Sequence, residues 1–127
     1  MEIMIVDDEP QVAEVLAHSL SRQGHQTTVV HSGQEALDQI RTRPLDAMFL
    51  DVSMPGMNGL DVMVEVKRLK PALAVVVITG HATAEEVERM KQLGAVDVIQ
   101  KPSALTYYHR AIEHLHTPKG YPRNAGL

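Results

Sequence analysis

The sequence predicts an α/β domain in which one five-stranded parallel sheet is covered by helices on both faces. Short, β-rich apolar runs alternate five times with longer segments of helical periodicity. At least three of the short runs are apolar throughout, as is typical of strands covered on both faces. Parallel neighbours need crossover connections, and right-handed crossovers give a doubly wound arrangement. A chain of 127 residues is the size of a single domain.

The expected strands are the short apolar runs. They cover residues 2–6, 26–30, 46–50, 74–78 and 96–99. The expected helices are the longer periodic segments. They cover residues 10–23, 33–41, 59–69, 84–93 and 104–116. After Leu115 the pattern fades into a segment that contains proline and glycine, so we assign 1–116 to the folded domain and 117–127 to a linker or a free tail.

Polar and conformationally special residues mark the ends of these helices. Two pairs have the spacing of a capping box, in which a hydroxyl accepts from a first-turn amide: Ser32 with Glu35, and Thr83 with Glu86. Asn58 is a suitable N-cap for the third helix. Residues that stop a helix follow at Gly24, Pro44, Pro71 and Gly94. The local chemistry therefore agrees with the periodicity.

Composition excludes several classes of function. The chain has no cysteine, which rules out disulfides and thiolate sites and fits a reducing compartment such as the cytoplasm. No apolar run approaches the length of a membrane span, and the apolar start ends at Asp7 and Asp8, unlike a signal peptide. A net charge of -4 repels phosphate backbones, and three Tyr with one Phe cannot form a base-stacking platform. We expect a cytoplasmic protein that binds neither membranes nor nucleic acid directly.

Charged and polar residues follow the expected strands. Asp7 and Asp8 come after the first strand, Asp51 after the third, Thr79 after the fourth and Lys101 after the fifth. In an open parallel sheet, ligands bind beyond the carboxyl ends of the strands, where the strand order reverses. If the first and third strands are neighbours, as in the order 2-1-3-4-5, the three acids lie close together.

Such a cluster of acids needs a compensating positive charge. Carboxylates about 4 Å apart repel by roughly 4 kcal/mol per pair at an effective dielectric constant near 20. Oxygen ligands without His or Cys suit Mg²⁺, which often completes its coordination with phosphate oxygens. Lys101 adds a compact second charge and Thr79 a rotatable donor. The set fits an incoming phosphoryl group.

Four segments in this order resemble the receiver (CheY-like) domain of bacterial two-component response regulators, over about residues 2–116. They are Ile5-Val6-Asp7-Asp8-Glu9-Pro10, Leu50-Asp51-Val52-Ser53-Met54-Pro55-Gly56-Met57-Asn58-Gly59, Ile78-Thr79-Gly80, and Gly94-Ala95 followed by Lys101-Pro102. The resemblance implies a flavodoxin-like (βα)5 fold with strand order 2-1-3-4-5. It also implies signal transduction in a phosphorelay.

The resemblance implies that Asp51 accepts a phosphoryl group from a sensor histidine kinase or a phosphotransfer protein. It implies that Asp7 and Asp8 bind Mg²⁺ together with the Asp51 carboxylate and the Ser53 backbone carbonyl. No other cofactor is implied. In-line transfer to Asp51 would then be assisted mainly by positioning and charge, so the chain is expected to be a switch, with at most self-catalysed phosphotransfer and slow dephosphorylation.

The remaining roles implied by the resemblance concern the response. Lys101 holds the phosphoryl group without attacking it, and Thr79 swings toward it, which biases the helix at 84–93. The face formed by 84–93, 96–99 and 104–116 is the implied docking surface for an output domain, a partner protein or a second copy of the chain.

The sequence departs from the family at one position of the switch. Tyr or Phe usually stands three residues before the Lys-Pro pair, and here that residue is Val98. A branched aliphatic cannot swing a ring between buried and exposed sites, so we expect a reduced change or one transmitted through 84–93 alone. From the family pattern, His81 is expected beside the phosphorylation site, where it would tune the access of hydrolytic water. For the other His residues, structural or solvated roles are favoured over zinc.

Two other functions stay open on sequence alone. A haloacid-dehalogenase-like phosphatase also uses an Asp nucleophile, but it typically has a second Asp two residues later, where this chain has Ser53. Val98 leaves room for a binding module that no longer needs phosphorylation. The domain could also stand alone or regulate a longer protein.

Overall fold

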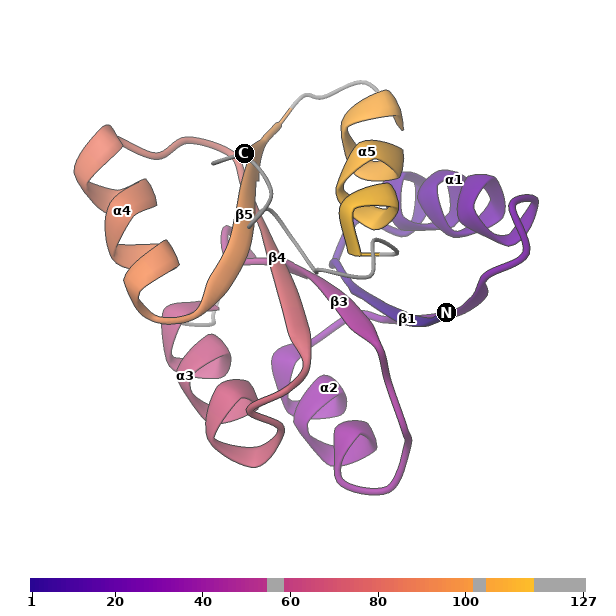
Figure 1. Ribbon diagram of the computed structural model, residues 1–127, viewed down its shortest axis with the longest axis horizontal. Helices are drawn as coiled ribbons and strands as arrows, with labels where there is room; N and C mark the ends of the chain where they lie inside the picture. The colour runs from indigo at the N-terminus through magenta and orange to yellow at the C-terminus, as the bar shows by residue number, and fades with distance from the viewer. Residues whose placement is uncertain (55–58, 102–104, 116–127) are drawn as a thin grey trace.

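Strands and helices alternate along the chain in the computed structural model, which describes residues 1–54, 59–101 and 105–115 (Figure 1). The strands are β1 (Glu2–Val6), β2 (Gln26–Val30), β3 (Ala47–Asp51), β4 (Ala74–Thr79) and β5 (Ala95–Gln100). The helices are α1 (Pro10–Ser21), α2 (Gly33–Ile40), α3 (Gly59–Leu69), α4 (Ala84–Gln92) and α5 (Leu105–Leu115). The kind and order of these elements confirm the prediction. The expected ends of the last helix, residues 104 and 116, and the proposed tail at 117–127 lie outside the described residues.

The sheet is parallel and has the order β2-β1-β3-β4-β5. Figure 1 shows α1 and α5 on one side of it and α2, α3 and α4 on the other. This confirms the doubly wound, flavodoxin-like fold. The order reverses at β1, because the chain builds outward first to β2 and then in the other direction through β3, β4 and β5.

Each face of the sheet has its own apolar layer, because successive strand residues point to opposite faces. In β1, Ile3 and Ile5 belong to the cluster under α1 and α5, whereas Met4 and Val6 belong to the cluster under α2, α3 and α4. Aliphatic residues and Met fill both layers, as the low aromatic content predicts. The described residues contain one aromatic pair, Phe49 of β3 edge-on to Tyr108 of α5 at 5.6 Å between ring centroids.

The helix caps follow the sequence in one case and depart from it in another. Thr83 and Glu86 form the complete capping box of α4. Ser32 accepts from the Glu35 amide at 3.1 Å, but the Glu35 carboxylate accepts from the amide of His31, outside the helix. The expected box at α2 is therefore wrong in its second half, because the Glu35 carboxylate accepts from the residue before the cap and not from the cap residue itself. Asn58 lies outside the described residues.

The start of α3 packs closely against the segment after β3. A Cβ atom on Gly59 would overlap the backbone and side chain of Val52. Glycine is thus required for α3 to approach this segment, which follows Asp51. Among the described residues, no helix has both the length and the apolar character needed to cross a bilayer.

Candidate functional site

Three polar side chains are buried at the carboxyl ends of the central strands. Asp7 follows β1, Asp51 ends β3 and Thr79 ends β4, and each is at most 3% exposed. They are the buried polar residues of the described part of the chain. Asp51 and Thr79 are the last residues of their strands instead of the first residues beyond them, so the sheet itself fixes their backbones. Charged and polar side chains are rarely buried unless they serve a function, so these three residues indicate a functional site at this edge of the sheet.

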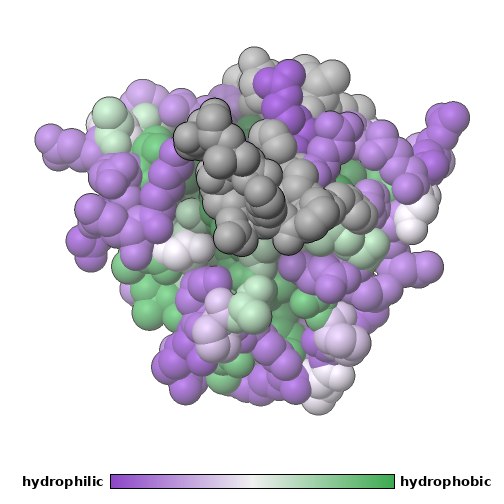
Figure 2. All heavy atoms as spheres, viewed as in Figure 1, coloured by the Kyte–Doolittle hydropathy of each residue, from purple (hydrophilic) through white to green (hydrophobic). Residues whose placement is uncertain are grey.

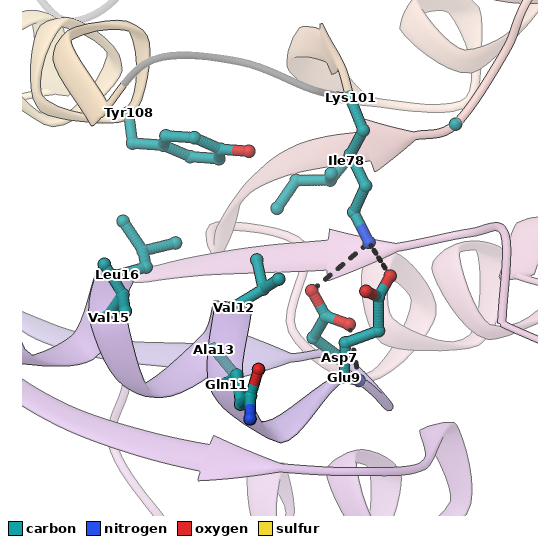
Figure 3. Close-up of a pocket in the computed structure, with 11 residues that line it drawn as sticks. Asp7, Glu9, Gln11, Val12, Ala13, Val15, Leu16, Ile78, Lys101 and Tyr108 are labelled. Atoms are coloured by element: carbon teal, nitrogen blue, oxygen red, sulfur yellow. Dashed lines mark hydrogen bonds and ion pairs between the residues drawn. The ribbon is translucent and has the colours of Figure 1, made fainter.

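Lys101 brings the acids together from the far end of the sequence. Its Nζ lies 2.6 Å from Asp51 Oδ2, 3.4 Å from Asp7 Oδ2 and 3.1 Å from Glu9 Oε1. Figure 3 shows the side chain of Lys101 descending from β5 between Asp7 and Glu9. Its backbone N–H donates to the carbonyl of Thr79 at 2.8 Å, which anchors the turn after β5 to β4. One cation therefore neutralises part of a cluster of acids.

Burial and the neighbouring charges shift the pKa values of Lys101 and Asp7. Burial alone lowers the pKa of Lys101, but its hydrogen bonds to Asp51 and Glu9, with the charges of Asp51 and Asp7, outweigh that effect and raise the pKa above its ordinary value. Burial raises the pKa of Asp7, opposed by the hydrogen bond from the Glu9 amide and by Lys101. Lys101 is therefore a permanent cation, unsuited to act as a base.

The backbone around Asp7 is held by β2 and the residue after it. The Asp7 N–H donates to the carbonyl of Val30 at 3.0 Å, and Nδ1 of His31 donates to the carbonyl of Asp7 at 2.9 Å. The Glu9 N–H donates to Asp7 Oδ1 at 2.9 Å. These bonds fix the direction of the Asp7 side chain. His31 is a contributor that the sequence did not indicate, because nothing local relates it to Asp7.

Four carboxylates are grouped closely enough to share a cation. Asp7, Asp8, Glu9 and Asp51 each offer an oxygen, and these oxygens lie within 4.8 Å of one another. An oxygen-only set with both buried and exposed members fits a hard divalent ion that keeps water ligands. The structure brings together the three predicted acids and adds Glu9, which the sequence showed only as a neighbour of the Asp-Asp pair.

Asp51 is also bonded on its other oxygen. Asp51 Oδ1 accepts from the Ser53 N–H at 2.8 Å and from Ser53 Oγ at 2.9 Å, and Ser53 Oγ accepts from the Gly80 N–H at 2.9 Å. The Thr79 hydroxyl donates to the carbonyl of His81 at 3.2 Å. Thr79 is thus close to the site but bonded within its own loop. The expected effect of exposed His81 on water stays a prediction.

A cavity of about 640 Å³ adjoins the acids between α1 and α5. Asp7 and Lys101 form its polar end, and Figure 3 shows Tyr108 opposite Val12 and Leu16 across it. In α1, the spacing of Val12, Val15, Leu16 and Leu20 is typical of residues that face the core. Leu16 and Leu20 are buried as this spacing indicates, but Val12 is 43% and Val15 56% exposed, and both line the cavity.

From their residue types, Tyr107, Tyr108 and Arg110 of the last helix are candidate interface anchors. Tyr108 does not fit that role, because it is 5% exposed and packs on Phe49. The side chain of Tyr107 lies outside the described residues. Val98 packs against the apolar layer that contains Met90 of α4. No aromatic side chain therefore occupies the switch position of β5.

The chain matches the response regulator receiver domain family over residues 3–113. The DNA-binding transcriptional regulator NtrC of Klebsiella pneumoniae is 35% identical over 127 residues, which cover 97% of this chain and 27% of NtrC. Response regulator MprA of Mycobacterium avium is 38% identical over 105 residues, which cover 83% of this chain and 46% of MprA. The chain thus spans less than half the length of either relative.

Solved structures agree with these matches. A CheY-like receiver domain protein from Methanospirillum hungatei aligns with a TM-score of 0.83 at 23% identity, covering 88% of this chain and 90% of that one, and shows the shared fold. The receiver domain of NtrX from Brucella abortus is 34% identical with a TM-score of 0.81, covering 87% of this chain and 94% of that one. The family match over residues 3–113 and the 34% identity to the NtrX receiver domain, 94% of which is covered, show that the chain belongs to the response regulator receiver domain family.

Proposed function

We propose that this receiver domain is a phosphoryl-accepting switch in which Asp51 is the phosphoacceptor. The observation that carries the proposal is the buried Asp51 carboxylate, 2.6 Å from the Lys101 ammonium and grouped with three other acids. A buried carboxylate with one permanent cation and room for a second is suited to receive a dianionic group. The proposed donor is the phosphohistidine of a sensor histidine kinase or a phosphotransfer protein, in the cytoplasm.

Asp51, Lys101 and Thr79 have different roles in the proposed transfer. A carboxylate oxygen of Asp51 forms the new bond to phosphorus while the P–N bond of the phosphoimidazole breaks, and the electron pair leaves on the imidazole nitrogen. Lys101 stays charged and stabilises the oxygens of the transferring group. Thr79 is one residue from the Gly80 amide and can turn its hydroxyl toward the new group.

Mg²⁺ is the metal that best suits the acids. Asp7, Asp8 and Asp51 would hold it with the Ser53 carbonyl, and Glu9 is close enough to join directly or through water. When bound, the ion neutralises negative charge on the acids and on the phosphoryl oxygens. Asp7 and Asp51 supply fixed ligands because their backbones belong to or adjoin the sheet, whereas exposed Asp8 can adjust to the coordination geometry.

The cavity beside the acids supports a place for the phosphodonor. Exposed Val12 and Val15 of α1 lie along the cavity that leads to Asp7 and Lys101. A donor that rests apolar side chains on α1 would bring its phosphohistidine to the polar end. This surface combines an apolar contact area with the reacting group, as a transient signalling interface requires.

The output surface is proposed at α4, β5 and α5. The outward side chains of α4 are charged, with both signs present, and the left side of Figure 2 shows this hydrophilic surface. An output domain, a separate partner or a second copy of the chain could be recognised there through charge. The net charge of -4 argues that any nucleic-acid contact of the whole regulator belongs to another part of it.

Ser53 argues for a switch over a phosphatase. Its hydroxyl stands two residues after Asp51, where a phosphatase of the haloacid dehalogenase type needs an acid and base. The Ser53 hydroxyl is bonded between Asp51 and Gly80 and does not titrate near neutral pH. One stable phosphoryl group per chain is therefore expected, without steady turnover of phosphate esters.

The decisive experiment is phosphorylation by acetyl phosphate with Mg²⁺. Intact-mass spectrometry should detect one acid-labile phosphoryl group on the wild type and none on Asp51→Asn. Asp38→Asn, which changes an exposed carboxylate on α2, serves as the matched control and should be modified like the wild type. Modification of Asp51→Asn to the wild-type extent would refute the assignment.

A further inference from the structure

We infer that the Ser53 hydroxyl is a hydrogen-bond bridge that holds the β4–α4 loop (residues 80–83) to Asp51 in the unphosphorylated protein. The hydrogen bonds of this bridge break when Asp51 is phosphorylated. The inference rests on the proposed function, because it needs Asp51 to be the phosphoacceptor. It assigns to Ser53 a positioning role in the response. The three residues of this Ser53 bridge are Asp51, Ser53 and Gly80.

The bridge joins two segments that are distant in sequence. Ser53 Oγ donates to Asp51 Oδ1 at 2.9 Å and accepts from the Gly80 N–H at 2.9 Å. A serine hydroxyl has a single proton, and both bonds are satisfied only if that proton points at Asp51. The direction of the hydroxyl, and with it the acceptor offered to Gly80, therefore depends on the charge of Asp51.

Gly80 is connected to Ser53 by a hydrogen bond and not by packing. A Cβ atom on Gly80 would lie 3.6 Å from Ser53 Oγ, an ordinary contact, so no steric interlock holds the two together. Gly80 follows Thr79, whose hydroxyl bonds His81 in the same loop, and the loop leads to the N-cap of α4 at Thr83. A change at the Gly80 amide is thus one short loop away from α4.

Phosphorylation changes what the bridge is bonded to. Transfer joins an Asp51 oxygen to phosphorus as the P–N bond of the donor breaks, and the negative charge moves from the carboxylate to the phosphoryl oxygens. Hydrogen bonds to an ionised acceptor are roughly twice as strong as those to a neutral one. The Asp51 carbonyl that remains is a weaker acceptor for Ser53 than the carboxylate was. A phosphoryl oxygen is a stronger acceptor for the Gly80 amide than the neutral Ser53 hydroxyl, so the bond pattern of the unphosphorylated loop is lost.

The bridge gives this chain a route to α4 that needs no aromatic switch residue. Val98 packs in the apolar layer and has no ring to move. The Asp51–Ser53–Gly80 connection does not pass through β5. The expected path of the signal is from Asp51 through Ser53 to the β4–α4 loop and then to α4.

Amide NMR of the wild type, Ser53→Ala and Ser53→Thr tests the bridge, with Mg²⁺ and beryllofluoride as the phosphoryl mimic. Without the mimic, Ser53→Ala should speed hydrogen exchange at the Gly80 amide by about two- to tenfold, the effect of one lost hydrogen bond. Its α4 resonances should already lie partway toward their mimic-bound positions, so that the mimic shifts them less than in the wild type. Ser53→Thr keeps a hydroxyl and should restore wild-type behaviour.

Two controls separate the possible failures. Asp38→Asn changes an exposed carboxylate on α2, outside the bridge, and should retain the wild-type response of α4. Wild-type exchange at Gly80 together with a wild-type α4 response in Ser53→Ala would overturn the bridge. The Asp51 amide reports the proposed function separately: if it does not respond to Mg²⁺ and beryllofluoride in the wild type, the proposed function fails as well.

Discussion

The buried acids are the residues most affected by the conflict between stability and function. Asp7 is almost fully buried, and burial raises its pKa. The folded protein thus holds a proton on Asp7 more readily than the unfolded chain does. The stability cost of its charge is present above the folded pKa and disappears as the pH falls below the ordinary value of 3.8. Carboxylates kept at such a cost are typical of binding sites.

Asp7→Asn should therefore stabilise the protein in Mg²⁺-free buffer at pH 7, by on the order of 1 kcal/mol. The gain should shrink as the pH is lowered toward 4, because wild-type Asp7 then loses its charge. Urea unfolding at both pH values, with and without Mg²⁺, measures the effect. Mg²⁺ should stabilise the wild type and have less effect on Asp7→Asn. A gain that grows at low pH would contradict the argument, and Asp38→Asn should stay within about 0.5 kcal/mol of the wild type.

Among the elements, α3 depends on a glycine that lets it reach the segment after Asp51. Gly59→Ala would place a Cβ atom against the Val52 backbone, so we expect a loss of about 1–3 kcal/mol of stability from the forced shift. Because that shift moves the Asp51–Ser53 segment, phosphorylation by acetyl phosphate should also slow. Denaturant unfolding and a phosphorylation time course measure the two effects.

A second glycine provides the matched comparison. Gly24 has a φ of +93° but open space around its Cβ position, and it lies far from the acids at the end of α1. Gly24→Ala should cost about 1–2 kcal/mol through backbone strain alone, with an unchanged phosphorylation rate. Equal slowing in both variants would show that the rate follows global stability and not the position of Asp51.

At the scale of the whole molecule, the arrangement of the described helices leaves an apolar surface beside the site. Val15 of α1 is 56% exposed and lies along the cavity that ends at Asp7 and Lys101. Val64 of α3 is 46% exposed and does not line that cavity. The two valines are similar in exposure but differ in their relation to Asp51.

Val15→Glu should reduce phosphotransfer from a histidine phosphotransfer domain that phosphorylates the wild type, by about tenfold or more. A carboxylate there would be desolvated by an apolar partner and would repel the phosphoryl group. Transfer from acetyl phosphate should change little, because it needs no protein contact. Val64→Glu is the control and should keep wild-type rates with both donors. Equal losses in the two variants would refute the docking surface.

The sequence by itself determined the alternation of strands and helices, because the periods of apolar residues and the caps are local properties. It also determined which polar residues lie at the carboxyl ends of the strands, and the order of motifs indicated the family. The expected strand order was confirmed by the structure, so Asp7, Asp51 and Lys101 could be predicted to meet.

Only the tertiary structure decided the contacts that depend on how distant segments meet. Glu9 joins the acids through the path of the loop after β1, and His31 reaches the Asp7 carbonyl across the end of β2. Val15 is exposed, although its periodicity resembles that of a core residue, because helix spacing does not show where α5 packs. The bond from Gly80 to Ser53 joins two loops at the sheet edge. Register and packing are set by the whole core, so no local pattern contains them.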